Sequence, residues 1–257
     1  MKKDLFAQIM SAYGEFIELV KDIYRLGALQ GHLGWDQETI MPPKGAEVRG
    51  EILAWLAKER HLRIIDSNLG ELLTKVEAET DLDSDQSANV REMRRVYDKS
   101  IKLPSEFVSE FAKARSEALL GWQKARADSD FSAFEDQLQK LVDMTKQKID
   151  YFGITTTAYD VLLDEFEVGM TVEDYDPLFA GLKEKLVPLL QKILHSQKVN
   201  PVPRLPEGLT FSIAAQTEFC EKVSTNMGFD FEAGRMDAST HPFSAGLWPG
   251  DTRFTTR

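Results

Sequence analysis

The residues with the clearest chemical potential lie near the end of the 257-residue sequence, where His241-Pro242-Phe243 precedes Asp251-Thr252-Arg253-Phe254-Thr255. On a β-strand, Asp251, Arg253 and Thr255 share one face because successive side chains alternate. One interpretation is a capped turn followed by a surface ion pair, since exposed ion pairs are common and weak. The other is one wall of a polypeptide-binding groove, with His241 and Arg253 directed at carbonyl or carboxylate oxygens.

Catalytic motifs of the common kinds do not occur in the sequence. Its four histidines, His32, His61, His195 and His241, form no i, i+4 pair, and no H-E-x-x-H is present. G-x-S-x-G, the P-loop and G-x-G-x-x-G are also absent. Cys220 follows Phe219 in a helical pattern, which is typical of a small buried residue rather than a nucleophile. We therefore expect neither catalytic residues nor metal ligands within these 257 residues.

The composition indicates a soluble globular protein, with 42% hydrophobic and 28% charged residues. The formal net charge of −11 disfavours binding to nucleic acid, because phosphate backbones would be repelled. One cysteine excludes an internal disulfide, and no apolar run reaches the roughly 18 residues of a membrane helix. We expect a cytoplasmic protein that binds neither nucleic acid nor membrane.

Helices must position the candidate residues, because most of the sequence has helical periodicity. Apolar residues recur every three or four positions over 103–125 and 131–149, which predicts two long antiparallel helices joined by cap residues 128–130. Asp176-Pro177 predicts the start of a helix to about His195, which Pro188 should kink or divide. Further helices are predicted over 5–29, 48–62, 85–101 and 213–227, with an extended proline-containing loop over 199–208.

After Gly228 the pattern changes toward β-structure. Phe229-Asp230-Phe231-Glu232 alternates with period two, and Asp251–Arg257 is rich in threonine. The predicted fold is mainly α: a helical body with long antiparallel helices over 1–227, and a short β/loop segment over 228–257. This segment contains a small β-hairpin and lines the expected substrate groove.

These residues resemble the carboxypeptidase Taq family of metallocarboxypeptidases. That family carries H-P-F followed at short distance by D-x-R-x-T, and both motifs are present at 241–243 and 251–255. Trp35-Asp36, Met41-Pro42 and Arg49 are similar to the family's W-D…M-P…R segment. Further similar residues are Leu103-Pro104, Trp122, Ala125-Arg126, Asp130-Phe131, 159–164 and 169–171. The likeness therefore extends in order over nearly the entire chain.

The resemblance implies a hydrolase that releases C-terminal amino acids from peptides with a divalent metal, zinc, and that forms a homodimer. Family members are longer, and their zinc-binding H-E-x-x-H helix follows D-x-R-x-T, whereas this sequence ends at Arg257. We therefore expect the N-terminal part of such a peptidase. Alone, this part would bind no metal and would be inactive. Its function would be to place the peptide substrate.

The candidate substrate-binding residues have open alternatives. Arg253 would bind the substrate carboxylate through two parallel hydrogen bonds, or would instead be bonded to Asp251 or a backbone carbonyl. His241 would donate to a substrate carbonyl or brace the wall of the zinc site. Asp251, Thr255 and Phe243 complete the set, with core packing the favoured alternative for Phe243.

Two further alternatives concern the helical part. For Trp35 and Asp36 we expect packing and a helix cap. The alternative function for the chain is a non-catalytic helical scaffold that binds a partner protein through its grooves.

Overall fold

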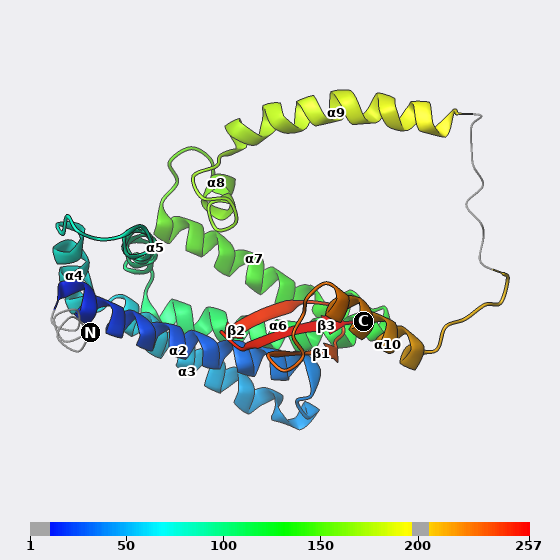
Figure 1. Cartoon of the computed structure of the whole chain (residues 1–257), viewed down its shortest axis with the longest axis horizontal. Coiled ribbons are helices and arrows are strands. Elements are labelled where there is room, and N and C mark those ends of the chain that lie inside the picture. Colours follow the sequence, from blue (N-terminus) through cyan, green and yellow to red (C-terminus); the bar gives the residue numbers. More distant parts are fainter. Residues whose placement is uncertain (1–10, 197–205) are drawn as a thin grey trace. The chain divides into compact units, whose positions relative to one another are not determined.

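The computed structural model describes residues 11–196 and 206–257, which belong to two compact units. The first unit comprises Met1–Phe152 and Asp230–Arg257, and the second comprises Gly153–Phe229. Helices dominate, and a small sheet lies near the end of the chain (Figure 1). The predicted mainly α fold is confirmed. The predicted division into 1–227 and 228–257 stays a prediction, and the compact units follow other boundaries.

The first unit contains helices over the predicted ranges and a further helix over 67–77 that was not predicted. They are α2 (Ala12–Thr39), η1 (Pro43–Gly45), α3 (Ala46–Ile64), α4 (Ser67–Glu77), α5 (Ser84–Ser100), α6 (Ser105–Asp128) and α7 (Ser132–Phe152). Helix α2 continues ten residues beyond Leu29, the end predicted for the first helix. Ser11 caps its start by accepting a hydrogen bond from the Gly14 amide at 3.0 Å. The part of the predicted helix before Ser11 lies outside the described residues.

The long pair formed by α6 and α7 is antiparallel, as predicted. Ser129 ends α6 in the left-handed conformation, with φ of 54°. Asp130 then accepts a hydrogen bond from the Ser132 amide at 3.1 Å at the start of α7. The pairing brings Phe107, near the start of α6, against Tyr151, near the end of α7, with ring centroids 5.2 Å apart.

The main apolar core of the first unit lies between α2, α4 and α5. Phe16, Leu69, Leu73 and Val76 are completely buried there. Burying a large apolar side chain stabilises a fold by about 1.5–3 kcal/mol. This core therefore holds α2 in place along the half of the helix that precedes the candidate site.

The sheet contains three strands in the order β1-β3-β2: β1 (Gly234–Ala238), β2 (Ser244–Trp248) and β3 (Asp251–Thr256). Strands β2 and β3 form a hairpin near the end of the chain, but its first strand is β2 and not the predicted segment 229–232. Strand β1 adds a parallel strand on the other side of β3. The predicted strand pattern over 229–232 is wrong, because the chain turns there. The Asp230 carboxylate accepts from the Glu232 amide at 2.8 Å, and an Asx turn of this kind competes with strand pairing.

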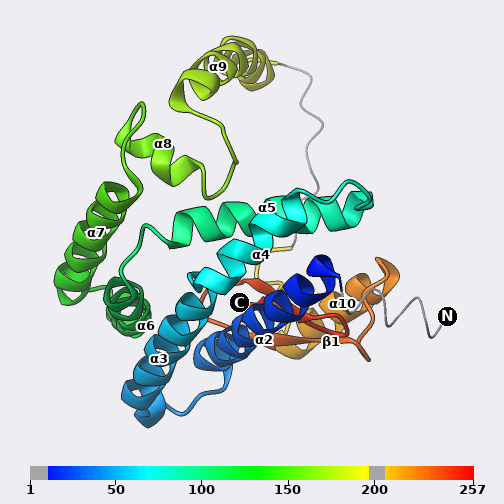
Figure 2. The same ribbon diagram turned by 90° about the vertical axis from the view of Figure 1, so that its left-hand side faces the viewer.

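The sheet packs against α2 through β2 (Figure 2). At the contact, Leu247 is buried and lies directly over Gly31. A Cβ atom on residue 31 would lie only 2.7 Å from Leu247 Cδ2. Glycine at this position thus permits the close approach that brings β3 within reach of the α2 side chains.

The second unit consists of α8 (Ala158–Leu163), α9 (Val172–Leu194) and α10 (Ile213–Asn226). Helix α9 begins four residues before the predicted Asp176, because the Asp174 carboxylate accepts from the Thr171 amide and hydroxyl at 2.9 and 2.8 Å. Helix α9 continues through Pro188 and is not divided there. Cys220, predicted as buried, is half-buried. Residues 199–205 of the predicted loop lie outside the described residues.

Across residues 11–196 and 206–257, every helix is too short or too polar to span a lipid bilayer. The predicted cytoplasmic location stays a prediction.

Candidate functional site

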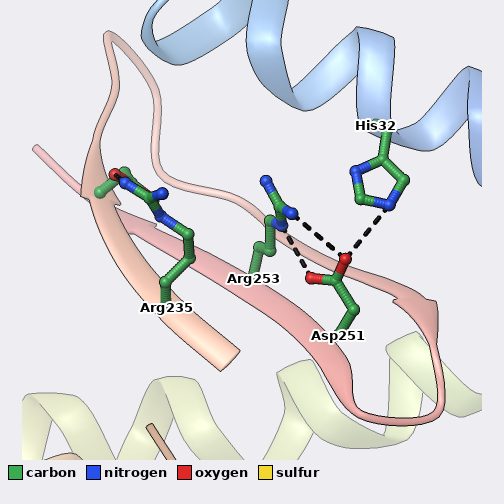
Figure 3. A network of polar contacts seen from close by, with 5 residues as sticks. His32, Arg235, Asp251 and Arg253 are labelled. Atoms are coloured by element: carbon green, nitrogen blue, oxygen red, sulfur yellow. Dashed lines mark hydrogen bonds and ion pairs between the residues drawn. The ribbon is translucent and has the colours of Figure 1, made fainter. Parts of the chain in front are cut away.

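The candidate site is built around the side chains of Asp251 and Arg253 on β3. Arg253 donates to both carboxylate oxygens of Asp251, from Nε at 2.8 Å and from Nη2 at 3.1 Å. His32 Nε2, on α2, lies 3.1 Å from Asp251 Oδ2 (Figure 3). The Arg253 hydrogen bond holds the pKa of Asp251 below its usual value, and the charges of Arg253 and His32 add to this effect against partial burial. Asp251 therefore stays an anion that orients Arg253.

Trp35 provides the surface on which the Arg253 guanidinium rests. Arg253 Cζ lies 4.2 Å from the centroid of the Trp35 ring, and Arg235 Cζ from β1 lies 5.1 Å from the same centroid. Both distances are within the range of cation–π attraction, which strengthens when the ring is desolvated. Trp35 is only 4% exposed, so its predicted packing role is combined with that of a platform for two cations.

The two arginines are neighbours in the sheet. Arg235 and Arg253 are register partners in the parallel pair β1–β3. Each forms a fork with an aspartate of its own strand: Arg235 binds Asp237 at 2.7 and 2.6 Å, as Arg253 binds Asp251. Because each cation has its own carboxylate, the two guanidinium groups lie beside one tryptophan without a large net repulsion.

Asp36 does not cap the helix with its side chain, so this prediction is wrong. Its Oδ2 atom forms an ion pair with Arg49 Nη2 at 2.6 Å, and Arg49 Nη1 donates to the Leu33 carbonyl at 2.6 Å. Arg49 belongs to α3 and thus ties that helix to α2 on the turn that carries Trp35.

Arg253 keeps one edge available for a ligand. A guanidinium has five N–H donors, and the pair formed by Nε and Nη2 is engaged by Asp251. Within the described parts of the chain, Nη1 makes no hydrogen bond. The end formed by Nη1 and the second Nη2 hydrogen is therefore free to bind another carboxylate, although the side chain is only 17% exposed.

Thr255 lies inside the sheet and holds the loop between β1 and β2. Its hydroxyl accepts from the Phe243 amide at 2.8 Å and from the Ser239 hydroxyl at 2.7 Å. It also lies 3.2 Å from the Phe243 carbonyl, to which it donates. Phe243 is half-buried. The geometry gives Thr255 a loop-positioning part, and the substrate contacts of Thr255 and Phe243 stay predictions.

His241 occupies a different position from Arg253. Its exposed ring lies edge-on to Trp122 of α6, with ring centroids 6.4 Å apart. It is also near Glu38 of α2, whose pKa is raised by burial and lowered in part by the charge of His241. In the part of the chain that the structure describes, no hydrogen bond joins His241 to Asp251 or Arg253.

Sequence reasoning found Trp35 but missed His32 and Glu38 of α2. His32, Trp35 and Glu38 are spaced by three residues, which places them along one side of a helix. The predicted helix ends at Leu29, so His32 and Glu38 lie beyond it, whereas α2 extends to Thr39. Arg235 had no recognisable signal, because its place beside Arg253 depends on the non-local pairing of β1 with β3.

No three His, Cys, Asp or Glu side chains gather in a group suited to a metal ion within residues 11–196 and 206–257. The described residues thus do not fit a metal centre of their own, and we derive no catalytic step through a metal.

Comparison with known proteins shows similarity along nearly the entire chain. The family model for the carboxypeptidase Taq (M32) metallopeptidases matches residues 15–257. Thermostable carboxypeptidase 1 of Thermus thermophilus is 37% identical over 259 residues, covering 96% of this chain and 50% of the relative. Carboxypeptidase 1 of Bacillus subtilis is 32% identical, covering 95% of this chain and 48% of the relative.

Solved structures give the same result. The crystal structure titled BsuCP has a TM-score of 0.89 at 32% identity, covering 96% of this chain and 49% of that chain. The M32 carboxypeptidase from Deinococcus radiodurans R1 has a TM-score of 0.78 at 32% identity, with coverage of 96% and 49%. This chain thus spans about half the length of the relatives that it matches.

Proposed function

The chain belongs to the carboxypeptidase Taq (M32) metallopeptidase family, and on this premise we propose that it places peptides for the removal of their C-terminal amino acids. The family is one of hydrolases that act with a divalent metal ion. We propose zinc as that metal, held by a segment outside these 257 residues, since the relatives are about twice as long. By itself the chain is then inactive. A homodimer belongs to the same proposal and rests on the family resemblance. A cytoplasmic location is proposed as well, and it rests on the composition of the sequence.

The observation that carries the proposal is the free edge of the Arg253 guanidinium. Asp251 orients the group, Trp35 supports it, and the Nη1 end has no partner in the described residues. A planar guanidinium binds a carboxylate with two parallel charge-assisted hydrogen bonds. An exopeptidase that acts at the C-terminus needs such a group, because the free carboxylate distinguishes the last residue from all others.

The residues of this chain would bind and orient, and we assign none of them a proton transfer. Arg253 would hold the terminal carboxylate, and Asp251, which His32 contacts, would hold Arg253. The buried Trp35 ring would exclude water from one face of the guanidinium. Excluding water strengthens the ionic hydrogen bonds on the opposite edge.

The direct test compares peptides with a free C-terminal carboxylate and the same peptides as C-terminal amides. Calorimetric titration of this chain should show the acid binding about tenfold or more tightly than the amide, because charge-assisted hydrogen bonds are lost in the amide. Arg253→Ala should abolish this difference. Arg235→Ala is the matched control, because it removes an equal charge beside the same Trp35 ring and should leave the difference in place. Equal affinity of the unsubstituted chain for acid and amide would contradict the proposal.

A second test uses a longer protein in which this chain is joined to a segment carrying H-E-x-x-H. Arg253→Ala should lower kcat/KM for a peptide substrate by more than about tenfold, the size expected when a carboxylate contact is lost. A smaller loss would indicate that Arg253 only stabilises the sheet.

A non-catalytic helical scaffold is the second candidate function. The apolar side chains of α9 favour it, because Leu182, Leu186 and Leu190 are all exposed and offer a surface to a partner. If the coding sequence contained no metal-binding motif, this second candidate would replace the first.

A further inference from the structure

A pocket of about 540 Å³ lies in the first unit, where α2, α3, α6 and α7 meet. Its apolar walls are formed mainly by Leu53, Leu119, Trp122, Phe134 and Leu141. Ligand pockets in proteins commonly measure about 300–1,000 Å³ and are mostly apolar with a few polar groups. The size and the walls of this pocket suit one large apolar side chain with part of the main chain that carries it.

Two opposite charges line the same pocket. Glu38 of α2 is half-buried, and burial raises the pKa of its carboxyl group. Arg115 of α6 lines the pocket with an exposed side chain. In the described part of the chain neither residue forms an ion pair or a side-chain hydrogen bond. An acceptor and a donor are thus available at the rim of an apolar hollow.

The pocket adjoins the elements of the candidate site. Glu38 follows Trp35 by three residues on α2, a rise of about 4.5 Å along the helix axis. Trp122 forms a wall of the pocket and also contacts His241, in the loop that Thr255 ties to β3. The Arg253 guanidinium rests on Trp35 of α2, and Glu38 of the pocket lies one turn further along α2. A peptide whose carboxylate is held by Arg253 therefore has a side-chain pocket nearby.

We infer that this pocket, which Glu38 and Arg115 line, is a subsite for a large apolar or aromatic side chain of the peptide. Glu38 accepts a hydrogen bond from a backbone N–H of the peptide, and Arg115 donates to a backbone carbonyl. An anionic ligand would be repelled by Glu38 and a cationic ligand by Arg115, whereas a peptide segment offers a donor, an acceptor and an apolar group together. The inference rests on the proposed function and adds a side-chain preference to it.

The test fills the pocket without changing its charges. Ala112, on α6, lines the pocket, whereas Ala127, on the same helix, is exposed and lies outside it. The probes are acetylated tetrapeptides that end in alanine, with phenylalanine at one of the three preceding positions, and an otherwise identical peptide with glycine there. The unsubstituted chain should bind at least one phenylalanine peptide about tenfold more tightly than the glycine peptide, because burial of the ring is favourable.

Ala112→Trp should remove this preference, and Ala127→Trp should keep it. Circular dichroism checks the folding of both variants. If Ala112→Trp does not fold, Leu119→Ala takes its place and should lower the preference about fivefold by removing part of the wall. A missing preference in the unsubstituted chain, or a preference that survives pocket filling, would overturn the inference.

The same titrations separate the two proposals. If acid and amide peptides differ in affinity but phenylalanine brings no gain, the proposed function stands and the pocket inference fails. If phenylalanine brings a gain that Ala112→Trp removes, while acid and amide bind equally, the pocket stands and carboxylate placement by Arg253 fails.

Discussion

The first unit contains a packed apolar core between helices, whereas the apolar side chains of α9 in the second unit are exposed. In the first unit, Phe16, Leu69 and Leu73 are completely buried between α2, α4 and α5. Helix α9 has 23 residues, none of them buried, and its Leu186 and Leu190 are 55% and 52% exposed. The apolar side chains of α2, α4 and α5 therefore pack against one another, whereas no residue of α9 is buried by the described parts of the chain.

In the second unit, a buried carboxylate joins two of the described helices. Asp160 is 7% exposed, and its oxygens accept from the amides of Thr157 and Val172 at 2.9 and 2.7 Å. The Thr156 hydroxyl also donates to it, and these hydrogen bonds, led by that of Thr156, lower the pKa of Asp160 to about 2. The contacts tie the start of α8 to the start of α9. Charge-assisted hydrogen bonds thus connect α8 and α9 in this unit.

The candidate site lies entirely in the unit with the packed core. Arg253 and Asp251 lie on a strand whose sheet packs against α2, and α2 is anchored in that core. Binding groups that are held on packed elements keep their geometry better than groups on loops. The difference between the units therefore predicts where substitutions will be costly.

The largest effect is expected for Leu73→Ala in α4. Leu73 has no exposed surface, and its truncation should lower the free energy of unfolding by about 2–5 kcal/mol through lost burial and a cavity. Leu190→Ala in α9 is the matched control and should change it by less than about 0.5 kcal/mol. Urea unfolding followed by circular dichroism measures both, because the helices of both units contribute. Similar losses for the two variants would show that α9 is packed as firmly as α4.

A smaller effect is expected where the sheet meets α2. Gly31→Val places a side chain against Leu247 and should destabilise the sheet contact by about 1–3 kcal/mol through overpacking. Gly34→Val, on the same helix, meets no atom within 4 Å and serves as the control. Tryptophan fluorescence suits this measurement, because Trp35, Trp55, Trp122 and Trp248 all belong to the first unit. Equal stability of the two valine variants would argue against close packing of β2 on α2.

The smallest effect is expected from the pH dependence of the second unit. The pKa of Asp160 is about 2 in the fold, below the value of about 3.9 for an unfolded aspartate. The stabilisation is therefore fully present above about pH 4 and is lost as the pH falls through about 2. An NMR titration of the Asp160 carboxyl carbon should show this pKa.

Hydrogen exchange tests the same group by substitution. In Asp160→Asn, the amides of Thr157 and Val172 should exchange about tenfold faster or more, because each loses an ionic acceptor. Asp176→Asn removes an equal charge on the exposed side of α9 and should leave their exchange unchanged. Unchanged exchange in both variants would mean that Asp160 does not hold this unit together.

Local pattern was sufficient for α3, α5, α6 and α7 and for strand β3, whereas α4 and α8 were not predicted. The positions of α5, α6 and α7 follow from apolar periodicity and from caps such as Asp130, which act over a few residues. Prediction failed where a local side-chain hydrogen bond formed a turn or a helix start that the apolar pattern does not indicate. The Asx turn at Asp230 replaced a strand, and the Thr171–Asp174 contact moved the start of α9.

The sequence by itself determined most of the long helices, the strand β3 and the placement of Asp251 and Arg253 on one face of it, because successive side chains alternate along a strand. Only the tertiary structure decided that His32 and Trp35, more than 200 positions earlier in the chain, complete the surroundings of Arg253. It also decided that β1 places Arg235 beside Arg253. The physical reason is that periodicity and caps act between near neighbours, whereas the approach of distant segments depends on which surfaces exclude water together, as Gly31 and Leu247 do.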